Sequence, residues 1–231
     1  MSPLELDPAL AQSRWERIQD KIRQAAQTAG RDPAEITLLA VSKTFSSQDI
    51  RVFWDLGQKD FGENYLQEAQ EKIGLLPEPN WHFIGHLQTN KARFVPGLFS
   101  CLHTLESLEL AEKLDRHLRA RNLTLKVFIQ VNLAREASKS GLPPEDLAPF
   151  LEKLAAFPSL SPQGLMTLPP FSPDPEKSRP YFRSLYELRE KQAPRLKELS
   201  MGMSGDFTVA ISEGATIVRI GTALFGDRDY S

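Results

Sequence analysis

Cysteine is nearly absent from this sequence, since Cys101 is the only one among 231 residues. A single thiol cannot form an internal disulfide, and from the sequence it has no partner for a metal cluster. Such a composition is typical of a protein that folds without disulfide bonds, and it favours a cytoplasmic location.

Long apolar runs and an excess of charge of one sign are also missing. No apolar run reaches the roughly 18 residues that a bilayer-spanning helix needs, and the first residues, MSPLELDPALAQ, lack the apolar segment of a secretory signal. The 28 Lys and Arg and 30 Asp and Glu are spread along the chain and give a net charge of -2. A basic footprint for nucleic acid is therefore not evident. We expect a soluble cytoplasmic protein with no nucleic-acid and no membrane partner.

Low-complexity tracts and long linkers are absent as well. The nearest candidate, LPPFSPDPEKSRP at residues 168–180, is too short to separate domains and predicts a surface loop before a helix. We therefore expect one domain over residues 1–231, with residues 1–10 disordered.

What the sequence does contain is a regular alternation of two patterns. An amphipathic helix is predicted first, over residues 8–30, with Trp15, Ile18, Ile22 and Ala26 on one stripe. Apolar, β-rich runs then predict eight strands, at residues 37–43, 60–63, 81–85, 101–105, 126–131, 161–166, 198–201 and 217–220. Helical spacing follows them at residues 47–56, 65–74, 91–95, 107–121, 144–157, 175–196 and 206–213, with a last helix or turn after residue 222.

This alternation predicts an α/β protein with parallel strands and crossover helices. Eight such units favour a single-domain (β/α)8 TIM barrel with an extra N-terminal helix, and a doubly wound open sheet is the alternative. In a parallel barrel the functional site lies at the carboxyl ends of the strands. Most residues at these predicted ends are polar or glycine, which favours a site there.

Lys43 stands at one of these ends, separated only by Ser42 from the largely apolar run ITLLAV. One interpretation is that its stem packs on apolar neighbours while its ammonium group reaches solvent. The other is a desolvated lysine whose pKa falls, so that its neutral amine can attack a carbonyl. The local sequence supplies apolar surroundings and no adjacent carboxylate.

Two glycine–hydroxyl turns follow the seventh and eighth predicted strands. The first is SMGMSGDF at residues 200–207, and the second contains Gly221 and Thr222 within IVRIGTALFG. Taken alone, the first is better explained as an ordinary strand-to-helix turn with Ser204 or Asp206 as N-cap. Barrels frequently bind phosphate with the loops after these two strands, so the pair together indicates a phosphate site.

Four further polar positions have two interpretations, lead to an exclusion or remain candidates for the site. Arg219 lies inside the last strand, where it forms either an ion pair or a positive donor toward a ring or an anion. His82 and His86 are four residues apart, roughly 13 Å along a strand, so they cannot share an ion. We therefore expect no metal site. His86 and Asn132, at strand ends, remain candidates for the pocket lining.

The chain resembles the pyridoxal phosphate homeostasis proteins, the YggS/PROSC-type family, over nearly its whole length after the first helix. Seven segments match that family in order: LLAVSKT, FGENYLQEAQEK, WHFIGHLQTNK, VNLAREASKSGL, GLMTL, LSMGMSGDF and EGATIVRIGTALFG. The fourth departs from the commoner family form near residues 133–135, although Lys139 to Gly141 are retained.

The resemblance implies a fold-type III barrel similar to the N-terminal domain of alanine racemase, with pyridoxal 5'-phosphate as cofactor. It implies that Lys43 forms the Schiff base with the cofactor and that Arg219 faces the pyridine nitrogen. It further implies that the phosphate is held by Ser204, Gly221, Thr222 and Met203. The ring would be bordered by Asn64, Ile84 and Met201.

The same resemblance favours a carrier over an enzyme. An arginine at the pyridine nitrogen keeps that nitrogen unprotonated, which weakens the ring as an electron sink. A racemase also needs a second acid/base, which alanine racemase takes from a second domain that this chain, ending at Ser231, is expected to lack. We expect a monomeric, non-catalytic protein of vitamin B6 and amino-acid balance, with apo forms of pyridoxal phosphate enzymes as candidate partners. The alternatives are a fold-type III amino-acid racemase or decarboxylase and a Schiff-base aldolase for phosphorylated sugars.

Overall fold

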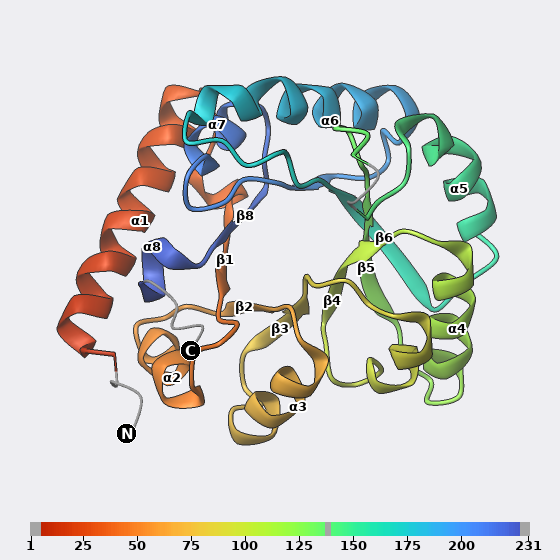
Figure 1. Cartoon of the computed structure of the whole chain (residues 1–231), viewed down its shortest axis with the longest axis horizontal. Helices are drawn as coiled ribbons and strands as arrows, with labels where there is room; N and C mark the ends of the chain where they lie inside the picture. Colours follow the sequence, from red (N-terminus) through yellow and green to blue (C-terminus); the bar gives the residue numbers. More distant parts are fainter. Residues whose placement is uncertain (1–5, 137–139, 227–231) are drawn as a thin grey trace.

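Eight parallel strands form a closed barrel in a computed structural model that describes residues 6–136 and 140–226 (Figure 1). Each strand pairs with the next in the chain, and β8 also pairs with β1. This closure confirms the TIM barrel and excludes the open doubly wound sheet. The strands are β1 (Thr37–Val41), β2 (Asp60–Glu63), β3 (Asn80–Phe83), β4 (Cys101–Leu105), β5 (Leu125–Gln130), β6 (Leu160–Met166), β7 (Glu198–Ser200) and β8 (Ile217–Ile220).

Alternation along the strands separates two apolar clusters. The larger cluster fills the space between the strands and the surrounding helices and includes Leu38 and Ala40 of β1. Leu39, between them, belongs to a smaller cluster inside the barrel, which also contains Cys101, Phe128, Met166 and Ile217. The remaining interior positions are largely polar, including the buried His103 and Arg219. The barrel interior therefore carries chemistry in addition to packing.

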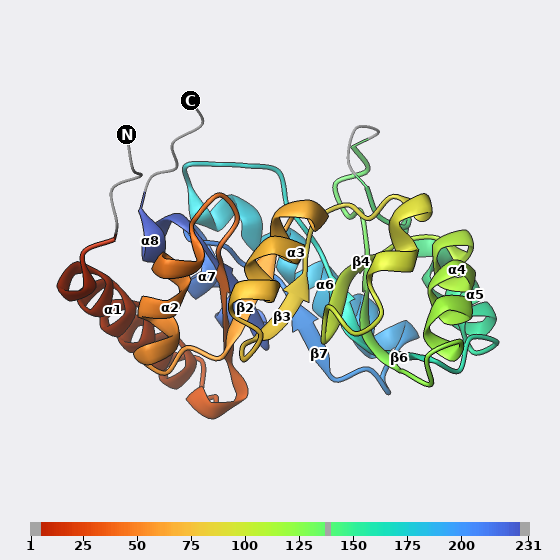
Figure 2. The same ribbon diagram turned by 90° about the horizontal axis from the view of Figure 1, so that it is seen from below.

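A shell of helices surrounds the strands (Figures 1 and 2). Its α-helices are α1 (Pro8–Thr28), α2 (Ser47–Asp55), α3 (Leu66–Leu75), α4 (Leu108–Arg119), α5 (Leu147–Leu154), α6 (Arg179–Gln192), α7 (Phe207–Ser212) and α8 (Thr222–Phe225). Short 3-10 segments are η1 (Pro33–Glu35), η2 (Thr89–Phe94), η3 (Pro144–Asp146) and η4 (Pro175–Ser178). No helix among the described residues is both long and apolar enough to cross a membrane.

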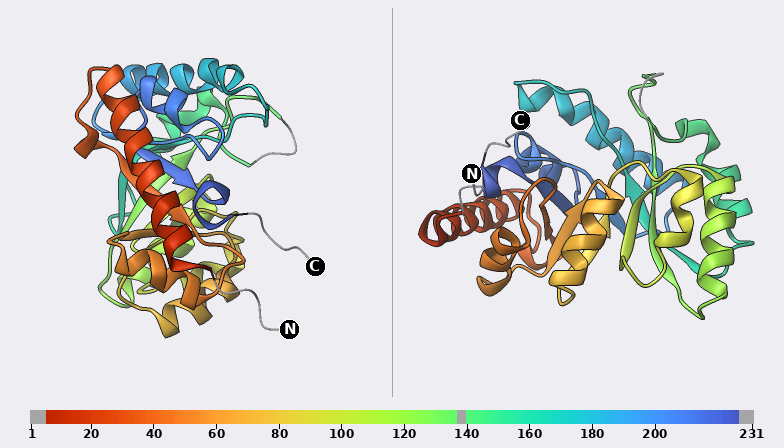
Figure 3. Two further views of the ribbon diagram at one scale, coloured as in Figure 1. Left: turned by 90° about the vertical axis from the view of Figure 1, so that its left-hand side faces the viewer. Right: turned by 60° about the horizontal axis from the view of Figure 1, so that its bottom comes forward.

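The extra N-terminal helix lies across the side of the barrel, against α7, α8 and α2 (Figure 3). The Asp7 side chain caps its first turn by accepting a hydrogen bond from the Ala9 N–H, and Pro8 suits the first helical position. Its buried stripe contains Ile18, Ile22 and Ala26, as predicted. Pro8–Leu10 form its first turn, which corrects the expectation of disorder for residues 1–10, of which residues 1–5 lie outside the described part.

Other differences from the predicted elements are local. Strand β1 ends at Val41, two residues before Lys43, because the chain turns at that point. The segment after β3 is the 3-10 helix η2 instead of an α-helix. The predicted helices at residues 144–157 and 175–196 each begin with a 3-10 turn that starts at a proline. Proline fixes the first turn, but its missing N–H does not decide which helix type follows.

Candidate functional site

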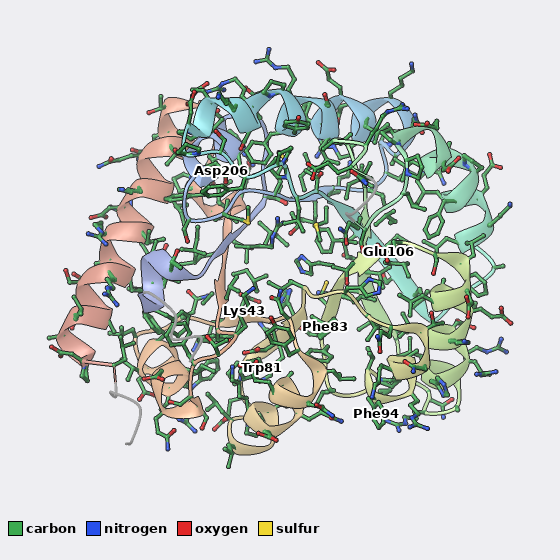
Figure 4. All side chains as sticks on the ribbon, viewed as in Figure 1. Lys43, Trp81, Phe83, Phe94, Glu106 and Asp206 are labelled. Atoms are coloured by element: carbon green, nitrogen blue, oxygen red, sulfur yellow. The ribbon has the colours of Figure 1, made fainter. Side chains whose placement is uncertain are left out.

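A cavity of about 310 Å3 opens where the carboxyl ends of the strands meet. Its walls come from β1, β2, β8 and the loops after β3, β6 and β7. The lining residues are Val41, Lys43, Asn64, Ile84, Leu168, Pro170, Phe171, Ser172, Met203, Ser204, Gly205, Asp206, Arg219, Gly221 and Thr222. Figure 4 shows Lys43 near the middle of the ring of strands, with Asp206 between that region and α7. The volume falls within the usual range for small-molecule sites.

Lys43 lies in a turn with an uncommon backbone conformation. The next residue, Thr44, has a φ of 72°, which a β-branched residue rarely adopts. Its N–H donates to the carboxylate of Glu68, and this contact from α3 holds the turn. Such outliers persist only where the surroundings hold them in place, and they cluster at functional sites.

A buried ionic cluster lies directly behind this turn. Lys72 of α3 donates to the Ser42 carbonyl at 2.7 Å, to Glu63 at 2.8 Å and to Glu68 at 2.5 Å. The Ser42 hydroxyl donates to the same Glu63 oxygen at 2.6 Å. Burial raises the pKa of Glu63 above its ordinary value although Lys72 and Ser42 oppose that shift. The cluster connects the end of β1 to β2 and α3. It thereby fixes the position of the backbone at Ser42, the residue before Lys43.

Asn64 is placed at the cavity by a close approach of two strand ends. A Cβ atom at Gly85 would lie 2.0 Å from the Asn64 carbonyl oxygen, so only glycine allows the segment after β3 to pass here. The Asn64 side-chain oxygen is buried and accepts no hydrogen bond from the described residues. A buried acceptor without a donor is costly, so this atom is available to a donor on a ligand bound in the cavity.

Arg219 reaches the cavity from inside β8, with only 4% of its surface exposed. Its guanidinium donates to the Ser200 hydroxyl at 2.7 Å and to the Thr167 carbonyl at 3.0 Å. Burial lowers the pKa of Arg219 to about 10, against a smaller opposing effect of Asp206. Among the described residues no carboxylate forms an ion pair with Arg219 within 4.0 Å, so the ion-pair interpretation of the sequence does not hold there.

The hydrogen bonds of Arg219 continue through the barrel interior. The Ser200 hydroxyl also contacts His103 Nδ1 at 2.9 Å, and His103 Nε2 lies 2.9 Å from His82 Nδ1. His82 Nε2 in turn lies 3.2 Å from a carboxylate oxygen of Asp60. A single direction of donation satisfies every step from the guanidinium to the carboxylate, with Nε2 of each imidazole protonated. Arg219 is therefore held by a series of hydrogen bonds that crosses the barrel interior from Ser200 to Asp60.

The turns after β7 and β8 meet at the cavity. Gly202 has a φ of 92°, and the Met203 N–H donates to the Asp206 carboxylate at 2.7 Å, which shapes the first turn. Ser204 in that turn accepts a hydrogen bond at 3.4 Å from the N–H of Ala223, which follows Thr222 in the second turn. The hydroxyls of Ser204 and Thr222 thus line the same wall.

Eight of the nine residues predicted for cofactor binding line this cavity: Lys43, Asn64, Ile84, Met203, Ser204, Arg219, Gly221 and Thr222. Met201 does not, because Ser200 points into the barrel and the next side chain packs outward into the larger apolar cluster. His86 and Asn132 are also outside the lining; His86 is largely exposed and contacts Glu106 at 3.0 Å. Lys139 lies outside the described residues.

One wall of the cavity was not predicted from the sequence; it is formed by Leu168, Pro170, Phe171 and Ser172. These residues belong to the proline-rich segment that was predicted only as a surface loop. Phe171 is 91% exposed while it borders the cavity. A phenylalanine among prolines and polar residues was the available signal, since a solvated loop has no need of one.

Comparison with known proteins gives consistent similarities. A family model described as the alanine racemase N-terminal domain matches residues 14–229. The pyridoxal phosphate homeostasis protein of Pseudomonas aeruginosa is 46% identical over 217 residues, which cover 93% of this chain and 94% of that protein. The protein of the same name from Aquifex aeolicus is 43% identical over 223 residues, which cover 94% of this chain and 98% of that protein.

Solved structures agree with this similarity. PipY of Synechococcus elongatus, solved with PLP bound, is 36% identical, with a TM-score of 0.76 over 89% of this chain and 100% of its own. The alanine racemase of Corynebacterium glutamicum has a TM-score of 0.69 at 17% identity, covering 97% of this chain and 62% of its own, and so shares the fold alone.

Proposed function

We propose, from the premise that the chain belongs to the pyridoxal phosphate homeostasis protein family and to that of the alanine racemase N-terminal domain, that it binds pyridoxal 5'-phosphate reversibly and acts as a non-catalytic carrier. The observation that carries the proposal is the common cavity of Lys43, Arg219 and the two glycine–hydroxyl turns. The Lys43 amine would bind the aldehyde carbon as a Schiff base with release of water.

The residues present fit the cofactor at each of its functional groups. Ser204 and Thr222, with the turns that carry them, would hold the phosphate, and Arg219 would donate to the pyridine nitrogen. The partnerless oxygen of Asn64 would accept from a donor on the ring side of the ligand. Ile84 and Met203 supply apolar contact. When bound, the cofactor supplies an aldehyde for amines and an aromatic ring that can accept electrons.

Two features favour a carrier over a racemase or a decarboxylase. First, a buried guanidinium at the pyridine nitrogen would donate its hydrogen bond without protonating the ring, which limits electron withdrawal. Second, Asp206 is the one carboxylate among the described lining residues, and it already accepts from the Met203 N–H and from Ser178 at 2.8 Å. No tyrosine, histidine or cysteine stands among those lining residues to act as a second acid/base.

The test is the visible absorbance of the purified protein before and after borohydride reduction, followed by peptide mapping. We expect a reducible chromophore and a label on Lys43, and Lys43→Ala should abolish both. An unlabelled Lys43 would contradict the cofactor assignment, and a colourless protein active on sugar phosphates would favour the aldolase alternative. Steady racemisation or decarboxylation of amino acids by the coloured protein would instead contradict the carrier assignment.

The finer points of the proposal concern its surroundings. We propose a monomer in the cytoplasm that buffers the reactive aldehyde and exchanges it with apo enzymes. The single, buried Cys101 supports a location where disulfides are not needed.

A further inference from the structure

A second cavity, of about 270 Å3, opens at the other end of the barrel. It is lined by residues at or beside the amino ends of the strands: Thr37, Asp60, Asn80, His82, Ser100, Cys101, Lys126, Phe128, Gln163, Glu198 and Ile217. The site proposed for the cofactor lies at the carboxyl ends, so the two cavities are separated by the packed interior. In a TIM barrel this lower face ordinarily serves stability, and a concentration of polar side chains there needs an explanation.

Three side chains of the kinds that bind metals lie together here: His82 and Cys101 line the lower cavity, and His103 lies buried beside them. His82, Cys101 and His103 each offer one ligand atom, and these atoms all lie within 4.8 Å of one another. The residues are 9%, 2% and 0% exposed. Parallel pairing of β3 with β4 sets His82 beside Cys101, and His103 follows two residues later on the same inward face. No metal site was predicted from the sequence, because His82 was compared only with His86 and Cys101 had no evident partner.

The outer nitrogen of each imidazole already has an orienting partner. His82 Nε2 lies 3.2 Å from the Asp60 carboxylate, and His103 Nδ1 lies 2.9 Å from the Ser200 hydroxyl. The inner nitrogens, His82 Nδ1 and His103 Nε2, face each other at 2.9 Å. Histidines that bind metals are commonly oriented in this way, with the free nitrogen donating to a carboxylate or another oxygen.

We propose that His82 Nδ1, His103 Nε2 and the Cys101 sulfur bind one zinc-class divalent cation, with its fourth position open to the lower cavity. Two imidazoles and a thiolate are a ligand set that suits zinc, which prefers four ligands in a tetrahedral arrangement. Tetrahedral zinc needs its two nitrogens about 3.4 Å apart, so the imidazoles must separate by roughly half an ångström.

The proton balance of this step is simple. Burial holds the pKa of the Cys101 thiol far above its ordinary value, so the thiol is protonated before the cation arrives. On binding, the sulfur gives its proton to solvent and bonds to the cation as a thiolate. The proton on His103 Nε2 moves to Nδ1 and is donated to Ser200. One proton is therefore released for each cation bound.

His103 meets another condition for binding, because its surroundings favour the neutral imidazole. Burial, followed by the charges of His82 and Arg219, lowers the pKa of His103 well below its ordinary value. Neutral imidazole is the form that binds metals. Lys126, which also lines the cavity, favours the thiolate over the thiol. Asp60 and Glu198 supply negative charge at the opening through which a cation would enter.

The test uses the full chain under reducing conditions with Co2+ as a spectroscopic probe for zinc. We expect visible absorption typical of four-coordinate cobalt, a thiolate-to-cobalt charge-transfer band, and loss of both on adding Zn2+. Cys101→Ala should remove the charge-transfer band and weaken binding at least 10-fold. Gln163→Ala is the matched control, since Gln163 lines the same cavity but offers no ligand of this class. Cobalt binding that is equal in Cys101→Ala and the wild type would overturn the proposal.

A second measurement does not depend on any variant. Because Cys101 is the only thiol of the chain, its rate of alkylation reports on this site alone. Zn2+ should slow alkylation at least 10-fold and release one proton per chain, and a chelator should restore the original rate. Alkylation that is unaffected by saturating Zn2+ would contradict the proposal even if the variants failed to fold.

Discussion

Lys72 and Glu63 form a buried ion pair with 2.8 Å between Nζ and the carboxylate, directly behind the strand end that leads to Lys43. Their side chains are 8% and 0% exposed. The sequence around Lys43 contains no adjacent carboxylate, but the fold brings Glu63 to the preceding residue, Ser42, whose hydroxyl donates to it. Lys72 is thus the side chain that pairs with this carboxylate. The turn at Lys43 therefore packs against a buried ion pair whose two members bind each other.

Removing one member of this pair should destabilise the protein strongly. Lys72→Met leaves Glu63 buried without its cation, and we expect a loss of about 3 to 5 kcal/mol in the free energy of unfolding. Chemical denaturation followed by circular dichroism measures it. Lys113→Met, which breaks the exposed pair with Glu109 on α4, is the control and should cost less than about 0.5 kcal/mol. Equal losses in the two variants would show that the buried pair does not hold the turn.

The course of the chain was largely predictable from the sequence, because burial in a parallel barrel leaves a direct record in it. Five of the six residues from Ile36 to Val41 are apolar, with no apolar/polar alternation, as expected for a strand with two covered faces. Turns rich in glycine, proline and polar residues then separated eight units, each made of a strand and the helix that follows it. What the sequence could not decide was the helix type after β3, since η2 and a short α-helix share the same residue preferences.

The lining of the cavity at the carboxyl ends was also largely predictable, in part because many of its residues stand at strand ends that can be counted along the chain and in part from the family resemblance. Met201, which the resemblance implied at the ring border, follows Ser200 by one position in the strand alternation, so its side chain faces the shell and not the interior. Phe171 was missed because loop paths are not encoded by periodicity. The meeting of His82 with Cys101 depends on the register between two strands, which no single-strand pattern contains.

The hydroxyl of Ser204 should contribute to cofactor retention without being needed for covalent attachment. Ser204→Ala removes a side chain that lines the proposed phosphate wall and accepts from Ala223, and we expect roughly 10-fold faster loss of cofactor on dialysis. Ser100→Ala makes the same chemical change at the lower cavity and should leave the rate unchanged. Equal rates in both variants would place the phosphate elsewhere.

The exposed ring of Phe171 should act on ligand release and hardly at all on stability. Because it is 91% exposed, Phe171→Ala should change the free energy of unfolding by less than about 0.5 kcal/mol. Its position on the cavity wall predicts that the variant loses cofactor several-fold faster. The rate of cofactor transfer to an excess of an apo enzyme measures this loss. Leu75→Ala removes an exposed apolar side chain that is 70% exposed and outside the lining, so it should change neither quantity.

Acid should weaken the contact between α6 and α7 through Glu213. Burial acts to raise the pKa of this carboxyl, but hydrogen bonds from Arg183 and Arg179 outweigh it and hold the pKa below the ordinary value of 4.5. A carboxyl whose pKa is lowered by folding stabilises the protein above its unfolded pKa, and this stability is lost as the pH falls through the folded value. The contribution is therefore complete at neutral pH and declines below pH 4.5.

The comparison that isolates this contribution is the wild type against Glu213→Gln across a pH series. Arg183 is 60% exposed, so solvent screening limits the expected difference in unfolding free energy to about 1 kcal/mol at neutral pH. That difference should shrink steadily below pH 4.5, whereas Glu152→Gln, an exposed change on α5, should show no such trend. A difference between wild type and Glu213→Gln that persists unchanged at low pH would mean that the glutamate acts by packing and not by charge.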